Sequence, residues 1–149
     1  MISQTDRQTD RQTEHELTGV PSVDKPWLKN YGEEVMHRPL PDGSMYDYMT
    51  FCNADRLDSV ALNYFGKKVM HWQMQEKIDT CARALLAYGV CSGDAVSLCV
   101  LAMPEAVYLL YAINKIGAIA NMLVMNATEA EIHEKLAVTE SKIVITVDL

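Results

Sequence analysis

The chain has 149 residues, of which 49% are apolar and 22% are charged, and its formal net charge is −7. This length is sufficient for one domain with a hydrophobic core. The acidic balance excludes a general electrostatic attraction to nucleic acid or to anionic lipid, and the only basic doublet is Lys67-Lys68. We therefore expect no nucleic-acid partner.

The chain opens with a polar tail, in which the tetrapeptide TDRQ occurs twice in tandem between residues 5 and 12. Because the tail contains almost no apolar side chains, burial cannot offset the entropy lost on ordering. We predict disorder over residues 1–25. The tail contains no secretory signal, and no two of the four cysteines have CxxC spacing, so we expect a reduced, cytoplasmic protein.

A short helix is the first element predicted after the tail. Ser44 and Asp47 have the spacing of a capping box, in which a hydroxyl and a carboxylate satisfy the free amides at a helix N-terminus. Apolar residues then recur at helical spacing through Cys52, which predicts a helix over residues 45–52.

A β-hairpin is predicted next. Two runs rich in β-forming residues, 60–65 and 68–72, flank Gly66-Lys67, a pair suited to a tight turn. Trp72, at the end of the second run, is interpreted as an aromatic anchor of the core.

The segment QMQEKIDTCARALLAYG then has the pattern of an amphipathic helix, and Gly89 fits a left-handed residue just beyond its C-terminus. The predicted inward face of this helix consists of Met74, Ile78, Cys81, Ala82, Leu85 and Leu86. Cys81 is thus expected to be a buried free thiol.

The rest of the chain alternates strands with helices. The predicted elements are strands over 95–101, 118–124 and 142–147, and helices over 104–116 and 128–138. Pro104 suits the first position of its helix, Gly117 suits the end, and Thr128 forms a second capping box with Glu131. Short links between these elements indicate parallel strands with right-handed crossovers. The predicted fold class is α/β: an N-terminal helix and β-hairpin followed by a parallel βαβαβ doubly wound layer.

Residues 106–125, AVYLLYAINKIGAIANMLVM, have the length of a membrane-spanning helix, which gives an alternative interpretation. A span would place Asn114 and Lys115 near the bilayer centre, where a lysine costs about 2.5–3.5 kcal/mol. Together with the Pro104 start and the Gly117 stop, this cost favours a helix followed by a strand over a transmembrane segment.

The ordered set of these features resembles the N-terminal region of the adenylate-forming acyl-CoA synthetases, the AMP-dependent synthetases and ligases. The resemblance is carried mainly by YGVCSGDAVSLCVLAMPEAVYLLYAINKIGAIANMLVMNATEAEI and SKIVITVDL. There a helix ends at Gly89 and Gly93-Asp94 forms a turn before the apolar strand. A helix that opens with Pro104-Glu105 follows, and Gly117-Ala118 forms the next turn. The resemblance implies that residues 26–149 are the N-terminal portion of a larger AMP-binding domain, truncated in this chain.

The resemblance also implies a reaction in two halves. A carboxylate attacks the α-phosphate of ATP to give an acyl-adenylate, and the thiol of coenzyme A then displaces AMP, with Mg²⁺ offsetting the phosphate charge. The cofactors and partners implied for the complete enzyme are therefore ATP, Mg²⁺, coenzyme A and a carboxylic acid substrate.

The chain departs from the family in the residues that perform this chemistry. It has no Ser/Thr/Gly-rich phosphate loop ending near a lysine, and no catalytic residue of the family maps onto residues 1–149. Ala102-Met103 stands where relatives often have polar residues around the following proline. We therefore predict no catalytic residue and no metal ligand, assign no cofactor-binding residue, and expect a fragment that is inactive alone.

Single residues give weaker signals. A metal site is not indicated by the four scattered histidines, His15, His37, His71 and His133. Tyr108 and Tyr111 could line an acyl pocket in a complete enzyme, but tyrosines in a buried helix also pack with the hydroxyl at the edge of the core.

Two interpretations from other classes stay open at this point. The chain could be a stand-alone interaction or scaffold module of the same fold, which self-associates through the apolar strand KIVITV at an open sheet edge. It could also be a small doubly wound nucleotide-binding domain in its own right, although it lacks the GxGxxG fingerprint.

Overall fold

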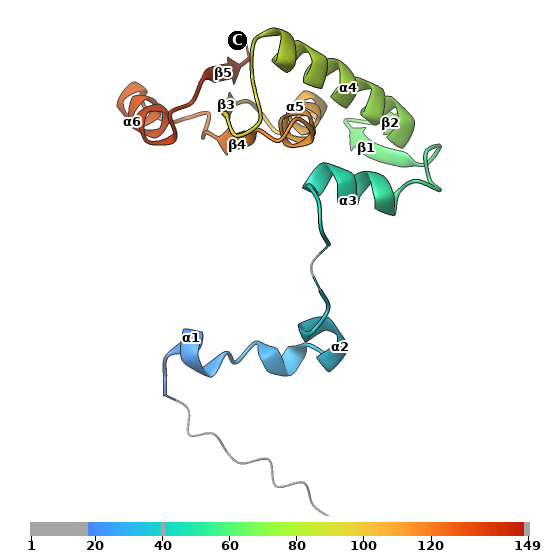
Figure 1. Ribbon diagram of the computed structural model, residues 1–149, viewed down its shortest axis with the longest axis vertical. Helices are drawn as coiled ribbons and strands as arrows, with labels where there is room; N and C mark the ends of the chain where they lie inside the picture. Colours follow the sequence, from blue (N-terminus) through green and yellow to red (C-terminus); the bar gives the residue numbers. More distant parts are fainter. Residues whose placement is uncertain (1–17, 40, 148–149) are drawn as a thin grey trace, which may run out of the picture. The chain divides into compact units, whose positions relative to one another are not determined.

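The computed structural model describes residues 18–39 and 41–147, and the TDRQ repeat lies outside them (Figure 1). The chain divides into two compact units, Met1–Leu40 and Pro41–Leu149. Disorder over residues 1–25 stays a prediction, because most of this tail falls on residues that are not described. The start of the family domain at residue 26 also stays a prediction.

The described part of the first unit consists of three short elements. They are α1 (Pro21–Asp24), the 3₁₀ helix η1 (Leu28–Asn30) and α2 (Glu33–Met36). The Asp24 carboxylate accepts a hydrogen bond from the Thr18 N–H at 2.9 Å, which ties the segment before α1 to its last residue. Neither α1 nor η1 contains a buried residue, so hydrogen bonds rather than a core define these turns.

The second unit begins with the predicted helix, α3 (Met45–Cys52). Its capping box is confirmed. The Asp47 N–H donates to Ser44 Oγ at 3.1 Å, and the Ser44 N–H donates to Asp47 Oδ2 at 2.9 Å. Because the side chain and backbone of Ser44 both donate to this carboxylate, the pKa of Asp47 lies below its usual range.

The predicted hairpin is confirmed as β1 (Val60–Tyr64) paired antiparallel with β2 (Lys67–Met70). Its turn lies at Phe65-Gly66, one residue earlier than the predicted Gly66-Lys67. Both turn residues have positive φ, 48° and 85°, as a two-residue hairpin turn of the primed type requires.

The prediction for Trp72 is wrong. Trp72 lies in the first turn of α4 (His71–Ala87), and it does not anchor the core, because it is 42% exposed. The helix begins at His71, within the predicted strand, because amide groups at its N-terminus have hydrogen-bond acceptors there. Gln73 Oε1 accepts from the Met70 N–H at 2.9 Å, and the Leu57 carbonyl accepts from the Trp72 N–H at 3.1 Å.

The core of the second unit lies where α4 and α5 (Pro104–Lys115) pack together beside the sheet (Figure 1). The predicted inward face of α4 is buried at Met74, Ile78, Ala82 and Leu85, and Cys81 is half-buried. The prediction fails for Leu86, which is 54% exposed. Residues adjacent in a helix point about 100° apart, so Leu86 turns away when Leu85 faces the core.

The three predicted strands form one parallel sheet. They are β3 (Ala95–Cys99), β4 (Ile119–Met122) and β5 (Ile143–Thr146), in the order β4-β3-β5. α5 connects β3 to β4, and α6 (Glu129–Thr139) connects β4 to β5. α5 and α6 lie on opposite sides of the sheet (Figure 1), so the predicted doubly wound βαβαβ layer is confirmed.

The side of the sheet toward α6 carries a polar cluster, which we call the hydroxyl network. Ser97 of β3 is fully buried, and its Oγ lies 2.6 Å from Ser141 Oγ. The Asn121 side-chain amide donates to Ser97 Oγ at 2.9 Å and to Thr139 Oγ1 at 3.2 Å. The network therefore connects two strands of the sheet with the end of α6.

Asn114 and Lys115, the polar pair in the apolar stretch 106–125, attach other helices to the end of α5. The Tyr46 N–H of α3 donates to Asn114 Oδ1 at 2.7 Å. Lys115 forms an ion pair with Asp79 of α4 and donates to Tyr46 Oη at 3.0 Å. The stretch is a helix followed by a strand, and none of the described helices is both long and apolar enough to cross a bilayer.

All four cysteines are free thiols. Cys99 is buried, whereas Cys81, which was predicted to be a buried thiol, is only half-buried. A reduced chain is consistent with this arrangement, and a cytoplasmic location stays a prediction.

Candidate functional site

The candidate site lies at the carboxyl end of β3, the central strand of the sheet. After Cys99 the chain runs through a short loop to Met103, which is extended, and Pro104 then occupies the first position of α5. Proline is suited to this position because its missing N–H would have no partner there. In open α/β sheets ligands bind outside the carboxyl ends of the strands, so this edge is where a ligand is expected.

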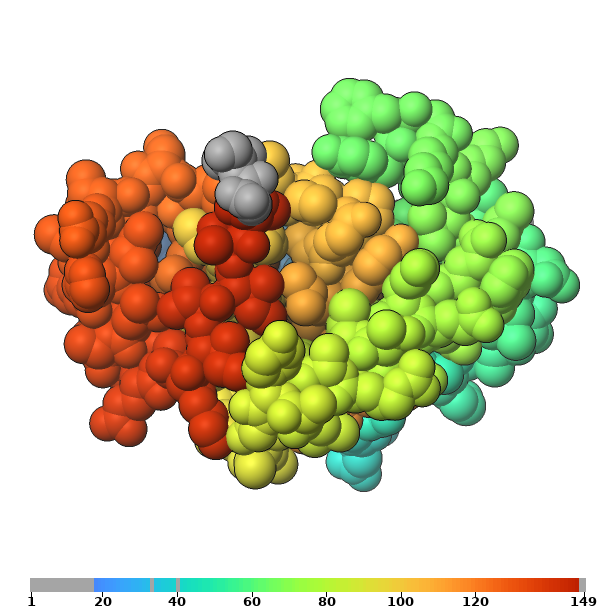
Figure 2. Space-filling model, turned by 90° about the horizontal axis from the view of Figure 1, so that it is seen from above, coloured from blue at the N-terminus to red at the C-terminus, as the bar shows by residue number. Residues whose placement is uncertain are grey.

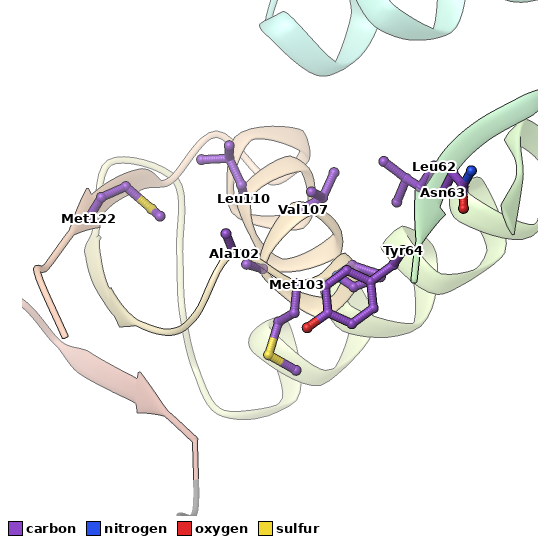
Figure 3. A pocket seen from close by; sticks show the side chains of 10 residues that line it. Leu62, Asn63, Tyr64, Ala102, Met103, Val107, Leu110 and Met122 are labelled. Carbon is purple, nitrogen blue, oxygen red and sulfur yellow. The ribbon is translucent and has the colours of Figure 1, made fainter. Parts of the chain in front are cut away.

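A cavity of about 330 Å³, which we call the apolar cavity, opens at this edge (Figure 3). Its lining comes from β1, the loop after β3, α5 and β4: Leu62, Asn63, Tyr64, Ala102, Met103, Pro104, Ala106, Val107, Leu110 and Met122. Figure 3 shows Val107 and Leu110 projecting from α5, and the Tyr64 ring beside Met103. The fold thus brings the hairpin to the carboxyl edge of the sheet.

The chemistry of the apolar cavity suits a hydrocarbon or aromatic group. Asn63 and Tyr64 are its only polar side chains, and no charged residue lines it. Met103 and Met122 have flexible, polarisable side chains, which adapt to ligands of different shape. The cavity can therefore hold an apolar group, and its lining contains no cation that would pair with a phosphate.

The apolar cavity carries no catalytic machinery of its own. The Tyr64 hydroxyl is the only ionisable group in its lining, so no carboxylate, imidazole or thiol there can act as a general base or nucleophile. Across residues 18–39 and 41–147, no group of three or more His, Cys, Asp or Glu side chains could hold a metal ion. The lining of the apolar cavity thus forms a binding surface.

Tyr108 and Tyr111 do not line the apolar cavity. Tyr108 is 7% exposed, and burial, reinforced by the Glu105 carboxylate, raises the pKa of its hydroxyl. Tyr111 is half-buried and packs against the same core. Their positions favour the packing interpretation.

The residues that do line the cavity carried almost no signal in the sequence. Leu110 and Met122 have the same chemistry as core residues, and only the fold shows that they face a void. Ala102-Met103, which the family resemblance marked only as a departure from the expected polar residues, lies in the cavity wall.

The model of the AMP-binding enzyme family matches residues 50–149. A long-chain-fatty-acid–CoA ligase of Bacillus subtilis is 28% identical over 126 residues, which cover 84% of this chain and 22% of the ligase. Acetyl-coenzyme A synthetase 1 of Candida albicans is 30% identical over 83 residues, covering 56% of this chain and 12% of the synthetase.

The fold has counterparts among solved structures. The N-terminal subdomain of Klebsiella oxytoca NpsA, in complex with 3-hydroxyanthranilyl-AMSN, matches with a TM-score of 0.68 at 24% identity. The match covers 72% of this chain and 28% of the NpsA chain. The chain thus spans less than a third of each of these proteins.

Proposed function

This chain belongs to the AMP-binding enzyme family, and on that premise we propose that it supplies the apolar part of an acid-binding site in an ATP-dependent acyl-CoA synthetase. Such an enzyme would join a carboxylic acid to AMP and then transfer the acyl group to the thiol of coenzyme A. The observation that carries the proposal is the apolar cavity at the carboxyl edge of the sheet, which suits the hydrocarbon portion of an acid. The 28% identity to a long-chain-fatty-acid–CoA ligase supports an aliphatic acid.

Binding of acids of graded chain length tests this role. Calorimetric titration should show that the chain binds dodecanoate more tightly than acetate, since each buried methylene contributes about 0.8 kcal/mol. Replacing Val107 by Phe fills part of the cavity and should weaken dodecanoate binding by about tenfold, the effect of losing room for roughly two methylenes.

The matched control is Val138→Phe, because Val138 is 79% exposed on α6 and lies away from the cavity lining. It should leave dodecanoate binding unchanged. If Val107→Phe and Val138→Phe bind dodecanoate equally well, or if the unmodified chain does not bind it, the acid-binding role is wrong.

We further propose that these 149 residues do not catalyse adenylation alone. The sequence contains no Ser/Thr/Gly-rich phosphate loop ending near a lysine. ATP–pyrophosphate exchange with acetate, octanoate or palmitate should stay at background. Carboxylate-dependent exchange above background would contradict the proposed inactivity. It would leave the proposed acid-binding role unaffected.

A second candidate function, self-association as an interaction module, is supported by the edge strand β5. Among the strands that the structure describes, β5 pairs with β3 alone. Beside β5 lies a groove of about 510 Å³ lined by apolar side chains that include Leu85, Leu109 and Ile145. Lys142, just before β5, donates to Asp94 Oδ2 at 3.0 Å, which holds the start of this strand against β3. A formed, uncovered edge is a template for another strand.

Sedimentation velocity tests this second candidate. Self-association predicts a dimer that Val144→Lys disperses, because Val144 lies in the middle of β5 and is already 43% exposed. Val138→Lys, on α6, is the matched control and should leave the dimer intact. A chain that stays monomeric at every concentration would rule out self-association.

A further inference from the structure

The turn of the β1–β2 hairpin has a feature that the folding of the hairpin does not explain. Phe65, its first residue, is 93% exposed and has a φ of 48°, in the left-handed region that bulky side chains rarely adopt. Hairpin turns of the primed type favour Asn or Asp at this position, followed by Gly. A phenylalanine here therefore lowers the stability of the turn and is not buried in return.

The turn is aromatic and projects from the surface. Figure 2 shows the green residues of the hairpin standing out beside the light-orange α5. The rings of Phe65 and Tyr64 meet edge to face, with their centroids 4.7 Å apart, and Tyr64 is itself 39% exposed. We call these two residues the aromatic tip. Its apolar surface is presented to whatever lies outside the described unit.

Positive charge lies next to the aromatic tip. Lys67 pairs with Tyr64 across the hairpin, and the next residue, Lys68, lies on the other face of the ribbon. Residues 59–75 contain no aspartate or glutamate. In the part of the chain that the structure describes, neither of these two ammonium groups forms an ion pair. The hairpin is thus locally positive on a chain whose net charge is −7.

The elements packed against the hairpin leave this charge positive. A groove of about 490 Å³ extends from β2 to the first turns of α4 and α5, and the charged residues in its lining are Lys67, Lys68, Lys77, Glu76 and Glu105. Ammonium groups therefore outnumber carboxylates beside the hairpin, which favours a negatively charged surface as its partner.

A lipid surface fits these features better than a protein partner does. A specific protein interface buries more than about 1,000 Å² in total and needs a matching shape, whereas the aromatic tip presents two side chains. A bilayer needs no matching shape. Aromatic rings enter the boundary between headgroups and acyl chains, and lysines beside them pair with anionic headgroups.

We propose that the β1–β2 hairpin docks the chain on an anionic bilayer surface, with Phe65 inserted at the headgroup boundary and Lys67 and Lys68 against the lipid headgroups. The hairpin also reaches the apolar cavity, because Tyr64 is part of the cavity lining. Docking therefore brings the cavity close to the lipid, which is a source of aliphatic acids. This consequence rests on the proposed acid-binding role, whereas docking itself does not.

Flotation with lipid vesicles measures docking directly. The chain should float with vesicles of phosphatidylcholine that contain about one-third phosphatidylserine, and should bind pure phosphatidylcholine about tenfold or more weakly. Added salt should release it from the mixed vesicles, because the lysine contacts are screened. Dodecanoate binding is measured without vesicles, so a failure of docking and a failure of the acid-binding role are distinguishable.

The variant Phe65→Asn separates docking from folding. Asn-Gly is the favoured pair for this turn, so the variant should melt at the same temperature as the parent or higher. It should nevertheless bind the mixed vesicles about tenfold or more weakly, because the inserted ring is lost. Phe51→Asn, on α3, is the matched control, since Phe51 is 80% exposed, and it should bind as the parent does.

Charge removal tests the lysines. The double variant Lys67→Gln and Lys68→Gln should bind the mixed vesicles about tenfold or more weakly, since each lysine near an anionic surface contributes roughly fivefold. The double variant Lys25→Gln and Lys135→Gln removes the same charge outside the hairpin and should bind as the parent does.

Insertion of the tip has a readout of its own. Phe65→Trp keeps an aromatic ring at the turn, and its emission should move to shorter wavelength on the mixed vesicles and be quenched by lipids brominated near the headgroup. The parent chain, in which Trp27 and Trp72 are the only indoles, gives the baseline.

Three outcomes would overturn the proposal. One is the absence of flotation with the mixed vesicles at low salt. Another is an equal loss of flotation in Phe65→Asn and Phe51→Asn, which would indicate general adsorption of exposed apolar side chains. The third is a dimer in sedimentation velocity that Phe65→Asn disperses, in a chain that does not bind vesicles, which would assign the aromatic tip to a second copy.

Discussion

The two sides of the central sheet are held by different physical interactions. On the side of α4 and α5, Ile78, Leu98 and Ile113 are completely buried. On the side of α6 no helix residue is buried, Val138 is 79% exposed, and the hydroxyl network makes the connection to the sheet. We infer that the first side carries most of the stability of the unit, while the second fixes the position of a helix whose apolar surface is largely uncovered.

The largest test of this comparison uses one substitution on each side. Ile113→Ala should lower the free energy of unfolding by about 3 kcal/mol, because it opens a cavity in the core. Ile132→Ala, in the half-exposed face of α6, should cost about 1 kcal/mol or less. Urea denaturation measures both, and equal costs would show that the two sides do not differ in this way.

A smaller effect is expected from the hub of the hydroxyl network. Ser97→Ala should cost about 1–3 kcal/mol, because it removes a partner of Ser141 and of the Asn121 amide in a buried position. Amide hydrogen exchange should show the loss of protection concentrated in α6. Ser22→Ala, at an exposed position of the first unit, is the control and should leave exchange in α6 unchanged. A cost near zero would mean that the network orders nothing.

The α4–α5 side also has polar contacts at its edge, and Asn114 makes one of them with α3. Asn114→Ala should cost about 1 kcal/mol, the usual value of a single hydrogen bond, because the Tyr46 N–H at the start of α3 loses its acceptor. Exchange should increase in α3 and not in α5. Asn126→Ala, at an exposed loop position, should change neither helix. Increased exchange in α5 as well would place Asn114 within the core rather than at its edge.

The fold was predictable from the sequence where local signals agree with one another. Pro104, Gly117 and the two capping boxes set the helix limits, and alternating strands and helices with short links leave few arrangements other than a parallel sheet. The prediction failed at Trp72, where aromatic and β-forming residues suggested a strand. Hydrogen bonds to the Leu57 carbonyl and to Gln73 start the helix instead, and these contacts depend on the folded hairpin.

The candidate site was much less predictable. A cavity is a property of packing, and Leu110 lining a void is indistinguishable in sequence from a leucine filling one.

The smallest predicted effect concerns how the two sides respond to acid. α6 begins with an ionisable cap: Glu131 Oε2 accepts from the Thr128 N–H at 2.8 Å and from the Thr128 hydroxyl at 2.9 Å. These hydrogen bonds hold the pKa of Glu131 below its usual value. A lowered pKa means that the cap stabilises α6 at neutral pH and that this contribution is lost as the pH falls through the folded-state value.

The corresponding position in α4 is Gln73, a neutral amide that cannot titrate. Exchange of the first-turn amides should therefore increase on acidification in α6 before it does in α4, and Glu131→Gln should remove the difference. If both helices lose protection at the same pH in the parent chain, the acid response belongs to the whole unit. The α6 side would then be no more independent of the core than α4 is.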